Sequence, residues 1–290
     1  MGIIKLLAQG FGATARKGRI LVFLWVIHFL FSLLIVAPFY FLLDSQFSRS
    51  LMGEKLFAGT DLLWLGDLIY RFQEIPPLLG GLVIGTSVLF LLLLVFLHGG
   101  IIGRIAAGEE KITLGNFFGD CGRYFGRLFR VFLLSLVGYL VVFGILGRLC
   151  SIPFRLWSKG ASTEWTLLLS SSLRLLVFLL LYSVVKMVFD YVKVTLVVEN
   201  SRKTIRTTLR TIRFLGRRFF KAWALFLLVG ALFVIATVVY LAVAKALPKT
   251  GIGPFVLFLW QQAYILARIW TVILFFATEY GFLKAHRPAV

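Results

Sequence analysis

The chain has 290 residues, 60% of them hydrophobic, and a mean hydropathy of +0.96. Apolar runs of 20 or more residues recur, long enough to cross roughly 30 Å of bilayer hydrocarbon, which excludes an ordinary soluble domain. The net charge of +19 would favour nucleic acid in a soluble protein. In a membrane protein, cytoplasmic loops collect Lys and Arg, so we expect no nucleic-acid partner.

Because backbone groups in lipid must be satisfied within each segment, the apolar runs must be helices, and we expect an all-α integral membrane protein. Residues 1–19 form a short basic interfacial helix. Six spans then follow, which pair into three hairpins: 20–43, 78–102, 128–149, 166–192, 219–244 and 255–283. We expect a basic amphipathic interfacial helix, or elbow, before each hairpin, within a single transmembrane domain over residues 1–290.

The segment 44–77 is the longest loop and carries five acidic and three basic residues. Its leucines after Asp61 predict a short amphipathic helix, which Pro76 and Pro77 end. The two termini, the turn over 103–130 and the turn over 186–221 together hold 21 Lys and Arg, against 8 in the other three loops. This bias predicts that both termini are cytoplasmic and that 44–77 is extracytoplasmic.

The hairpins are similar to one another. Units at 1–108, 109–198 and 199–290 each end their second span with a polar residue followed by a base: His98, Asp190 and Glu279, spaced by 92 and 89 residues. Internal repeats are common in membrane proteins that enclose a site between repeats. The alternative is that any row of basic-ended hairpins looks repetitive.

The most basic stretch lies between the fourth and fifth spans. Arg206, Arg210, Arg213 and Arg217 form one helical stripe, beside an apolar face with Ile205, Leu209, Ile212 and Phe219. Such a helix lies in the interface with its guanidinium groups among lipid phosphates. Together with Arg123 and Arg127 of the second elbow, this stripe is a candidate surface for lipid head groups or a partner. The alternative is a topology anchor.

Charged residues within the spans are the other candidates, because a charge at mid-bilayer costs several kcal/mol unless it is paired or wet. Lys186 and Asp190 share a helix face and can pair, or Asp190 can meet Lys193 instead. Arg268 lies deep in the last span. With His98, the set of intramembrane polar candidates is His98, Lys186, Asp190, Arg268 and Glu279. They form either a polar path or structural helix-end pairs that snorkel to the interface.

Motifs of catalysis are absent from the sequence. It has no nucleophile elbow, P-loop, HExxH or paired-carboxylate motif, so we expect no enzymatic activity. Cys121 and Cys150 fall at opposite ends of one span and cannot pair. His28 and His98 lie on adjacent spans, where hydrogen bonding is a better explanation than haem ligation. We expect no metal site and no cofactor.

Two patches resemble a pattern found in bacterial multi-pass membrane proteins of unknown function: 190–199, followed by the Arg-rich helix, and 116–125. The resemblance implies a bacterial inner-membrane protein. We therefore expect a non-enzymatic subunit or scaffold of a larger membrane assembly, with anionic phospholipids and other membrane subunits as partners. The alternative is a transporter or lipid-handling protein with a polar cavity lined by Lys186, Asp190, Arg268 and Glu279.

Overall fold

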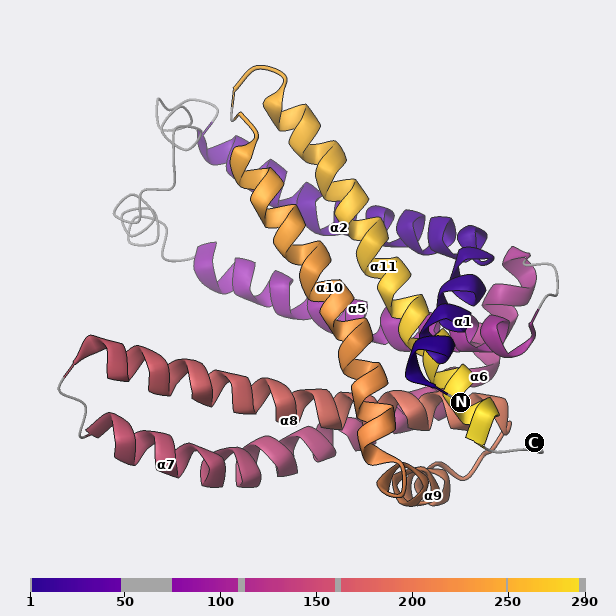
Figure 1. Ribbon diagram of the computed structural model, residues 1–290. Coiled ribbons are helices and arrows are strands. Elements are labelled where there is room, and N and C mark those ends of the chain that lie inside the picture. The colour runs from indigo at the N-terminus through magenta and orange to yellow at the C-terminus, as the bar shows by residue number, and fades with distance from the viewer. Residues whose placement is uncertain (1, 48–74, 109–112, 160–162, 249, 287–290) are drawn as a thin grey trace. The chain divides into compact units, whose positions relative to one another are not determined.

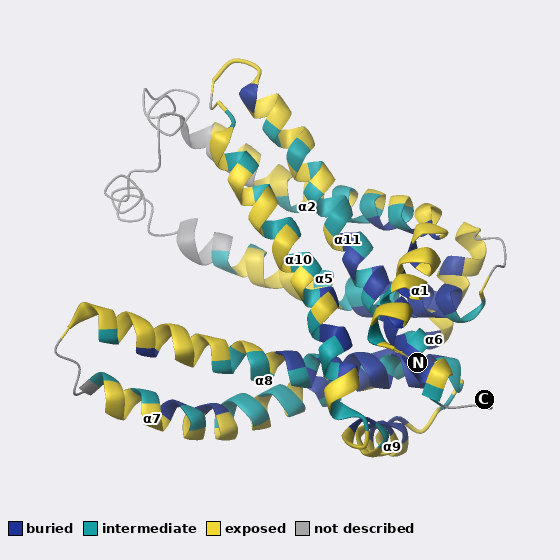
Figure 2. Cartoon of the chain, viewed as in Figure 1, coloured by how far each residue is buried: buried dark blue, intermediate teal, exposed yellow. Residues whose placement is uncertain are grey.

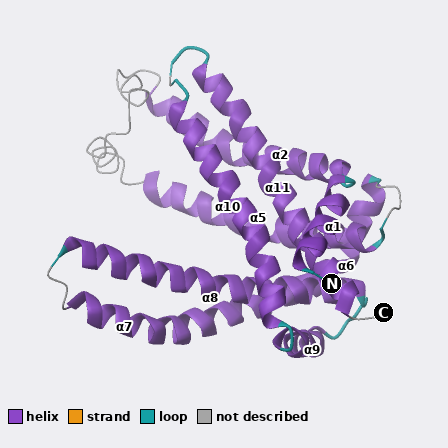
Figure 3. Ribbon diagram, viewed as in Figure 1, coloured by secondary structure: helices purple, strands orange, loops and turns teal. Residues whose placement is uncertain are grey.

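The computed structural model describes residues 2–47, 75–108, 113–159, 163–248 and 250–286, which form helices joined by turns, with no strand among them (Figures 1 and 3). The helices in chain order are α1 (Ile3–Ala15), α2 (Gly18–Phe47), α5 (Ile75–Ala106), α6 (Leu114–Val141), the π-helical turn η1 (Val142–Leu146), α7 (Gly147–Lys159), α8 (Glu164–Val198), α9 (Thr204–Gly216), α10 (Phe219–Ala246) and α11 (Gly253–His286). The all-α prediction is confirmed.

Six helical stretches are long and apolar enough to cross a membrane: Gly18–Pro38, Gly80–Ala106, Leu114–Ser158, Glu164–Val198, Phe219–Ala246 and Gly253–His286. They match the six predicted spans in number and order, although their ends differ from the predicted ones. The protein is therefore a multi-pass membrane protein. The amphipathic helix predicted after Asp61 lies outside the described residues.

The chain divides into two compact units. Unit 2 spans 22–94 and contains most of α2 and the first part of α5. Unit 1 contains residues 1–21 and everything from 95 onward, including the complete helices α1 and α6 to α11. These limits do not follow the predicted repeat boundaries, and the single domain built from three repeats stays a prediction.

The second elbow differs from the prediction. Residues 114–141 form one uninterrupted helix, so this elbow continues directly into the third span, whereas α1 and α9 are separate helices. The turn η1 then joins α6 to α7, and residues 150–159 are helical where we expected a loop. The start of α6 follows capping rules, because the Thr113 side chain accepts a hydrogen bond from the Asn116 amide at 3.2 Å.

Burial in unit 1 is concentrated in the part of each hairpin next to the elbows, which we call the basic end (Figure 2). Buried positions cluster at 183–197 of α8, 222–229 of α10 and 269–283 of α11. The other halves of these helices carry mostly exposed apolar side chains, such as Leu175 and Val238. In a membrane, lipid or another protein covers such a surface.

Close contacts at the basic end depend on small residues. A Cβ added at Gly100 of α5 would lie 2.5 Å from the Cys121 sulfur, and one at Gly10 of α1 would overlap a Thr278 methyl group. The ring of Phe189 lies 2.7 Å from the corresponding position at Gly138. Three helix pairs therefore approach each other closely: α5 with α6, α1 with α11, and α6 with α8. These contacts hold in place the helices that carry the buried polar residues.

Candidate functional site

The polar side chains predicted on α8 form a network. Asp190 is 3% exposed, and its two oxygens accept from two lysines: Lys186 at 2.7 Å and Lys193 at 2.8 Å. The lysines lie four residues before and three residues after Asp190, so one helix face carries all three. The prediction offered the two pairs as alternatives, and the structure contains both.

Glu279 of α11 completes what we call the polar cluster, which consists of Lys186, Asp190, Lys193 and Glu279. Its side chain is 2% exposed, and neither carboxylate oxygen accepts a hydrogen bond from any residue that the structure describes. Glu279 lies one helical turn after Phe275, whose ring centre is 4.8 Å from the Lys186 ammonium. A buried carboxylate without a donor is costly, since its full desolvation penalty is left uncompensated.

Aromatic residues from three helices surround the cluster. The Lys186 ammonium lies 5.4 Å from the ring centre of Phe226 on α10 and 4.8 Å from that of Phe275 on α11. Both rings hold the cation on their faces. Tyr191, next to Asp190, is 1% exposed, and its hydroxyl also has no hydrogen-bond partner among the described residues. The cluster therefore lies where α8, α10 and α11 meet.

A tight turn after α8 fixes the start of the basic elbow. Asn200 has a positive φ of 46°, while the Ser201 amide donates to the Leu196 carbonyl and the Asn200 amide donates to the Val197 carbonyl. This pattern is a Schellman cap, in which Asn tolerates the left-handed position. The Asn200 side chain also accepts from the Arg127 guanidinium at 2.6 Å. Arg127, a predicted head-group residue, thus anchors the turn.

Helix α9 has three faces rather than two. A face of threonines and one leucine packs on the protein: Thr204, Thr207, Thr208, Thr211 and Leu215 are buried. The apolar residues Ile205, Leu209 and Ile212 are exposed. Arg206, Arg210, Arg213 and Arg217 form the third face and are exposed as well, with Arg210 ion-paired to Glu199. Arg123 of α6 is exposed beside the ring of Tyr124.

The remaining predicted polar residues do not join the cluster. Arg268 is exposed on α11, and no described residue forms an ion pair or hydrogen bond with it. His98 is half-buried and packs edge-on against Phe276 at 5.1 Å between ring centres. The structure therefore brings Lys186, Asp190 and Glu279 together but not Arg268, and the cavity lined by all four stays a prediction.

Sequence reasoning missed a second buried ion pair. Arg104 of α5 and Asp120 of α6 are 8% and 9% exposed and lie 2.6 Å apart, and the Lys17 ammonium donates to the Arg104 carbonyl at 2.8 Å. The available signal was Asp120 itself, the only acidic residue between 111 and 163. An isolated acid among arginines and glycines is a candidate for a buried pair.

Within the described residues, no group of three or more His, Cys, Asp or Glu side chains is placed to hold a metal ion, and Cys121 and Cys150 are free thiols. The polar cluster instead has the chemistry of a site for a proton or a cation. The ionised Glu279 carboxylate has only acceptor atoms, and no described residue donates a hydrogen bond to it. Comparison with protein-family models, curated proteins and solved structures finds no significant match for the chain.

Proposed function

We propose that this protein is a non-enzymatic subunit or scaffold of a larger assembly in the bacterial inner membrane, with both termini in the cytoplasm. One observation carries the proposal: Arg268 is exposed in the middle of a membrane-spanning helix and has no partner among the described residues. A side chain of this kind requires a polar group from outside the part of the chain that the structure describes.

Arg268 lies too far from either end of α11 for its guanidinium to reach water by extending along the helix. It lies 15 residues after Gly253 and 18 before His286, or about 22 Å and 27 Å along the helix axis. A long side chain can snorkel only from positions near a helix end. An arginine at mid-bilayer costs several kcal/mol unless it is paired or hydrated. A transmembrane helix of a partner, bearing a carboxylate or another acceptor opposite Arg268, removes that cost.

The arginine face of α9 supports the second part of the proposal, contact with anionic phospholipids. The helix is attached to the protein by its threonine face, so its apolar and arginine faces remain exposed side by side. An interfacial helix has this arrangement, with apolar side chains in the acyl region and guanidinium groups at the phosphates. Each base near an anionic leaflet contributes about 1 kcal/mol.

The test of docking is purification of the tagged protein from native membranes in a gentle detergent, followed by quantitative mass spectrometry. Arg268→Gln is expected to reduce the co-purifying membrane proteins at least tenfold, because loss of one member of a buried charge pair at an interface weakens binding by roughly 2–5 kcal/mol. Arg268→Lys keeps the charge and should retain part of the binding.

The matched control is Lys245→Gln, which removes an exposed cation from the last turn of α10, at a helix end. It should leave the co-purifying proteins unchanged. If Arg268→Gln and wild type carry the same proteins in the same ratio, Arg268 is not a docking residue and the scaffold proposal fails.

Glu279 favours a second candidate function, a carrier that binds a proton or cation between the hairpins. Its carboxylate is buried within a membrane-spanning helix and has no hydrogen-bond partner among the described residues, and ion paths depend on groups of this kind. The Glu279→Gln variant distinguishes the carrier from the scaffold. In a carrier, Glu279→Gln abolishes solute or proton movement in vesicles while assembly persists. In a scaffold, the same variant leaves both the assembly and the vesicle permeability unchanged.

A further inference from the structure

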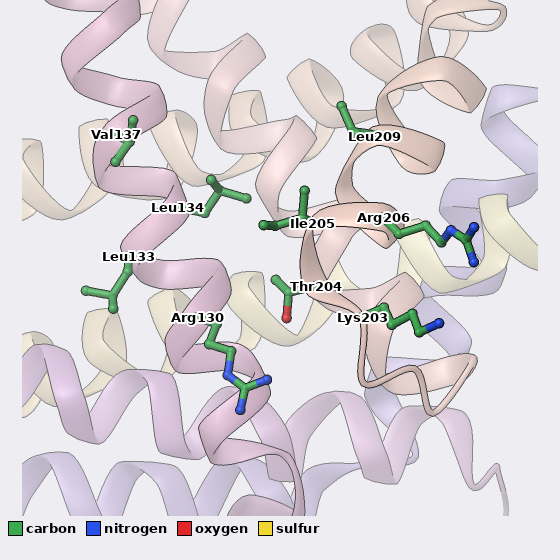
Figure 4. Close-up of a pocket in the computed structure, with 9 residues that line it drawn as sticks. All are labelled: Arg130, Leu133, Leu134, Val137, Lys203, Thr204, Ile205, Arg206 and Leu209. Atoms are coloured by element: carbon green, nitrogen blue, oxygen red, sulfur yellow. The ribbon is translucent and has the colours of Figure 1, made fainter.

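A groove runs between α6 and the first turns of α9, with a volume of about 870 Å³ (Figure 4). This volume lies within the range of sites that bind small molecules, roughly 300–1,000 Å³. Most of its lining is apolar: Leu133, Leu134 and Val137 come from α6, and Ile205 and Leu209 come from α9. All five belong to unit 1.

Polar groups gather at one end of the groove. The Thr204 side chain is 7% exposed, and its hydroxyl has no hydrogen-bond partner among the described residues. Figure 4 shows this hydroxyl on the side of Thr204 where Arg130 of α6 lies. Arg130 is exposed, and no described residue forms an ion pair with it. A buried hydroxyl and an unpaired guanidinium that line the same groove supply the donors that an anion requires.

The start of α9 adds backbone donors. Its first turn holds no acidic residue, and the residue before it, Lys203, supplies no side-chain cap. The first amides of a helix have no intrahelical acceptor, and the helix dipole favours an anion at that end. Lys203 and Arg206 extend from this turn on the side away from α6, and they make the potential around it positive (Figure 4).

We propose that this groove binds one anionic phospholipid. Its phosphate accepts hydrogen bonds from the Arg130 guanidinium, the Thr204 hydroxyl and the first amides of α9. One acyl chain follows Leu133 and Val137 along α6 toward the membrane. The apolar lining distinguishes a lipid from a free phosphate, since a soluble anion would leave those side chains uncovered. This inference rests on the lipid contacts of the proposed function and assigns them to one site.

The test uses the purified full chain in detergent, titrated with dioleoyl phosphatidylglycerol or dioleoyl phosphatidylcholine and followed by native mass spectrometry. The wild type is expected to bind its first phosphatidylglycerol about tenfold more tightly than phosphatidylcholine, because both lipids carry the phosphate but Arg130, Lys203 and Arg206 repel the choline ammonium. Arg130→Gln should weaken binding of phosphatidylglycerol about tenfold and remove most of the preference, because it removes the groove cation that α6 supplies. Thr204→Val should weaken binding of both lipids about threefold.

Two matched controls locate the site. Arg155→Gln removes an exposed arginine of α7, outside the groove, and should leave the preference intact. Val137→Trp fills the apolar part of the groove and should weaken binding of both lipids, whereas Val141→Trp, at a position equally exposed on α6 but outside the groove, should not. Both valines are about half exposed, so the substitutions leave the core alone.

Two results would overturn the proposal. One is the same lipid preference in Arg130→Gln and Arg155→Gln. The other is full competition by glycerol 1-phosphate, a head group without chains, which would make this a soluble-phosphate site. The Arg268→Gln protein separates this inference from the docking proposal. If this protein loses its partners but keeps the phosphatidylglycerol preference, the lipid site is supported independently of docking. If it keeps its partners and the lipid preference fails in the groove variants, the docking proposal alone is supported.

Discussion

Asp190 is the residue on which the polar cluster depends. Its buried carboxylate balances two lysines, so Asp190→Asn leaves both ammonium groups without their counter-charge. Breaking a buried pair by removing one partner typically costs about 3–5 kcal/mol. We therefore expect Asp190→Asn to lower the midpoint of thermal unfolding in detergent by roughly 10 °C, measured by the loss of monodisperse protein after heating.

A second carboxylate provides the control for this prediction. Glu199 pairs with Arg210, and their side chains are 12% and 55% exposed, so solvent screens this pair more than it screens the Asp190 pairs. Glu199→Gln should therefore shift the midpoint by only a few degrees. Adding Lys186→Met to Asp190→Asn should recover part of the loss, since one uncompensated cation is removed. Equal shifts for the two single variants would mean that burial of Asp190 contributes nothing to stability.

The sequence predicted part of this cluster. The spacing of Lys186 and Asp190 sets their pairing, because residues four apart on a helix are neighbours wherever the helix lies. The environment of Glu279 was not predictable, since it depends on how α11 packs against α8, and no local pattern records that. The same limit applies to Arg104 and Asp120, which come from different helices.

At the scale of elements, α9 illustrates why a helix can be predicted while the face that packs on the protein is not. Its arginine stripe follows from the sequence. Leu209 on the predicted apolar face is 64% exposed, as an interfacial helix requires, whereas the threonine face that packs on the protein, with Thr211 at 0% exposure, was not predicted. Threonine methyl groups pack closely against a protein, and a helix at a bilayer surface can turn its leucines toward lipid.

The contact between α5 and α6 gives a prediction at this scale. A Cβ at Gly100 would lie 2.7 Å from the Phe117 ring and 2.5 Å from the Cys121 sulfur, so Gly100→Ala must push the helices apart. Such overpacking typically costs about 1–3 kcal/mol. We expect a lower unfolding midpoint for Gly100→Ala, read by the same heating assay.

Gly85 on the same helix is the matched control. An added Cβ there meets nothing within 4 Å, and alanine favours a helix by up to about 1 kcal/mol over glycine. Gly85→Ala should therefore leave the midpoint unchanged or raise it. A Gly100→Ala protein as stable as wild type would show that α5 and α6 do not approach as closely as described.

The second elbow shows a limit of prediction for elements. Four glycines, at 115, 119, 122 and 126, fall where we expected a separate elbow helix, yet α6 runs through all four without a break. An added Cβ would meet nothing within 4 Å at any of these positions, so close packing against another helix does not explain them. The continuous helix satisfies every backbone group, and in an apolar environment this requirement outweighs the weak helix propensity of glycine.

For the whole molecule, the number and order of the spans were predictable, because bilayer thickness sets the length of an apolar run. How the hairpins pack was not. Their basic ends contain most of the buried residues, while the opposite halves expose large apolar side chains such as Leu176 and Ile235. Lipid or other chains have to cover those exposed halves. No local sequence pattern specifies such contacts.

The most direct test of the docking claim is site-specific cross-linking in native membranes. A photoreactive amino acid at Gln261 lies seven residues from Arg268, on the same face of α11, and the control position is Leu241 of α10, which is 58% exposed. We expect illumination to give one discrete protein adduct from position 261, which disappears when Arg268→Gln is added, and none from position 241. Lipid adducts alone at both positions would contradict a partner at this face and with it the proposal that this protein is a subunit.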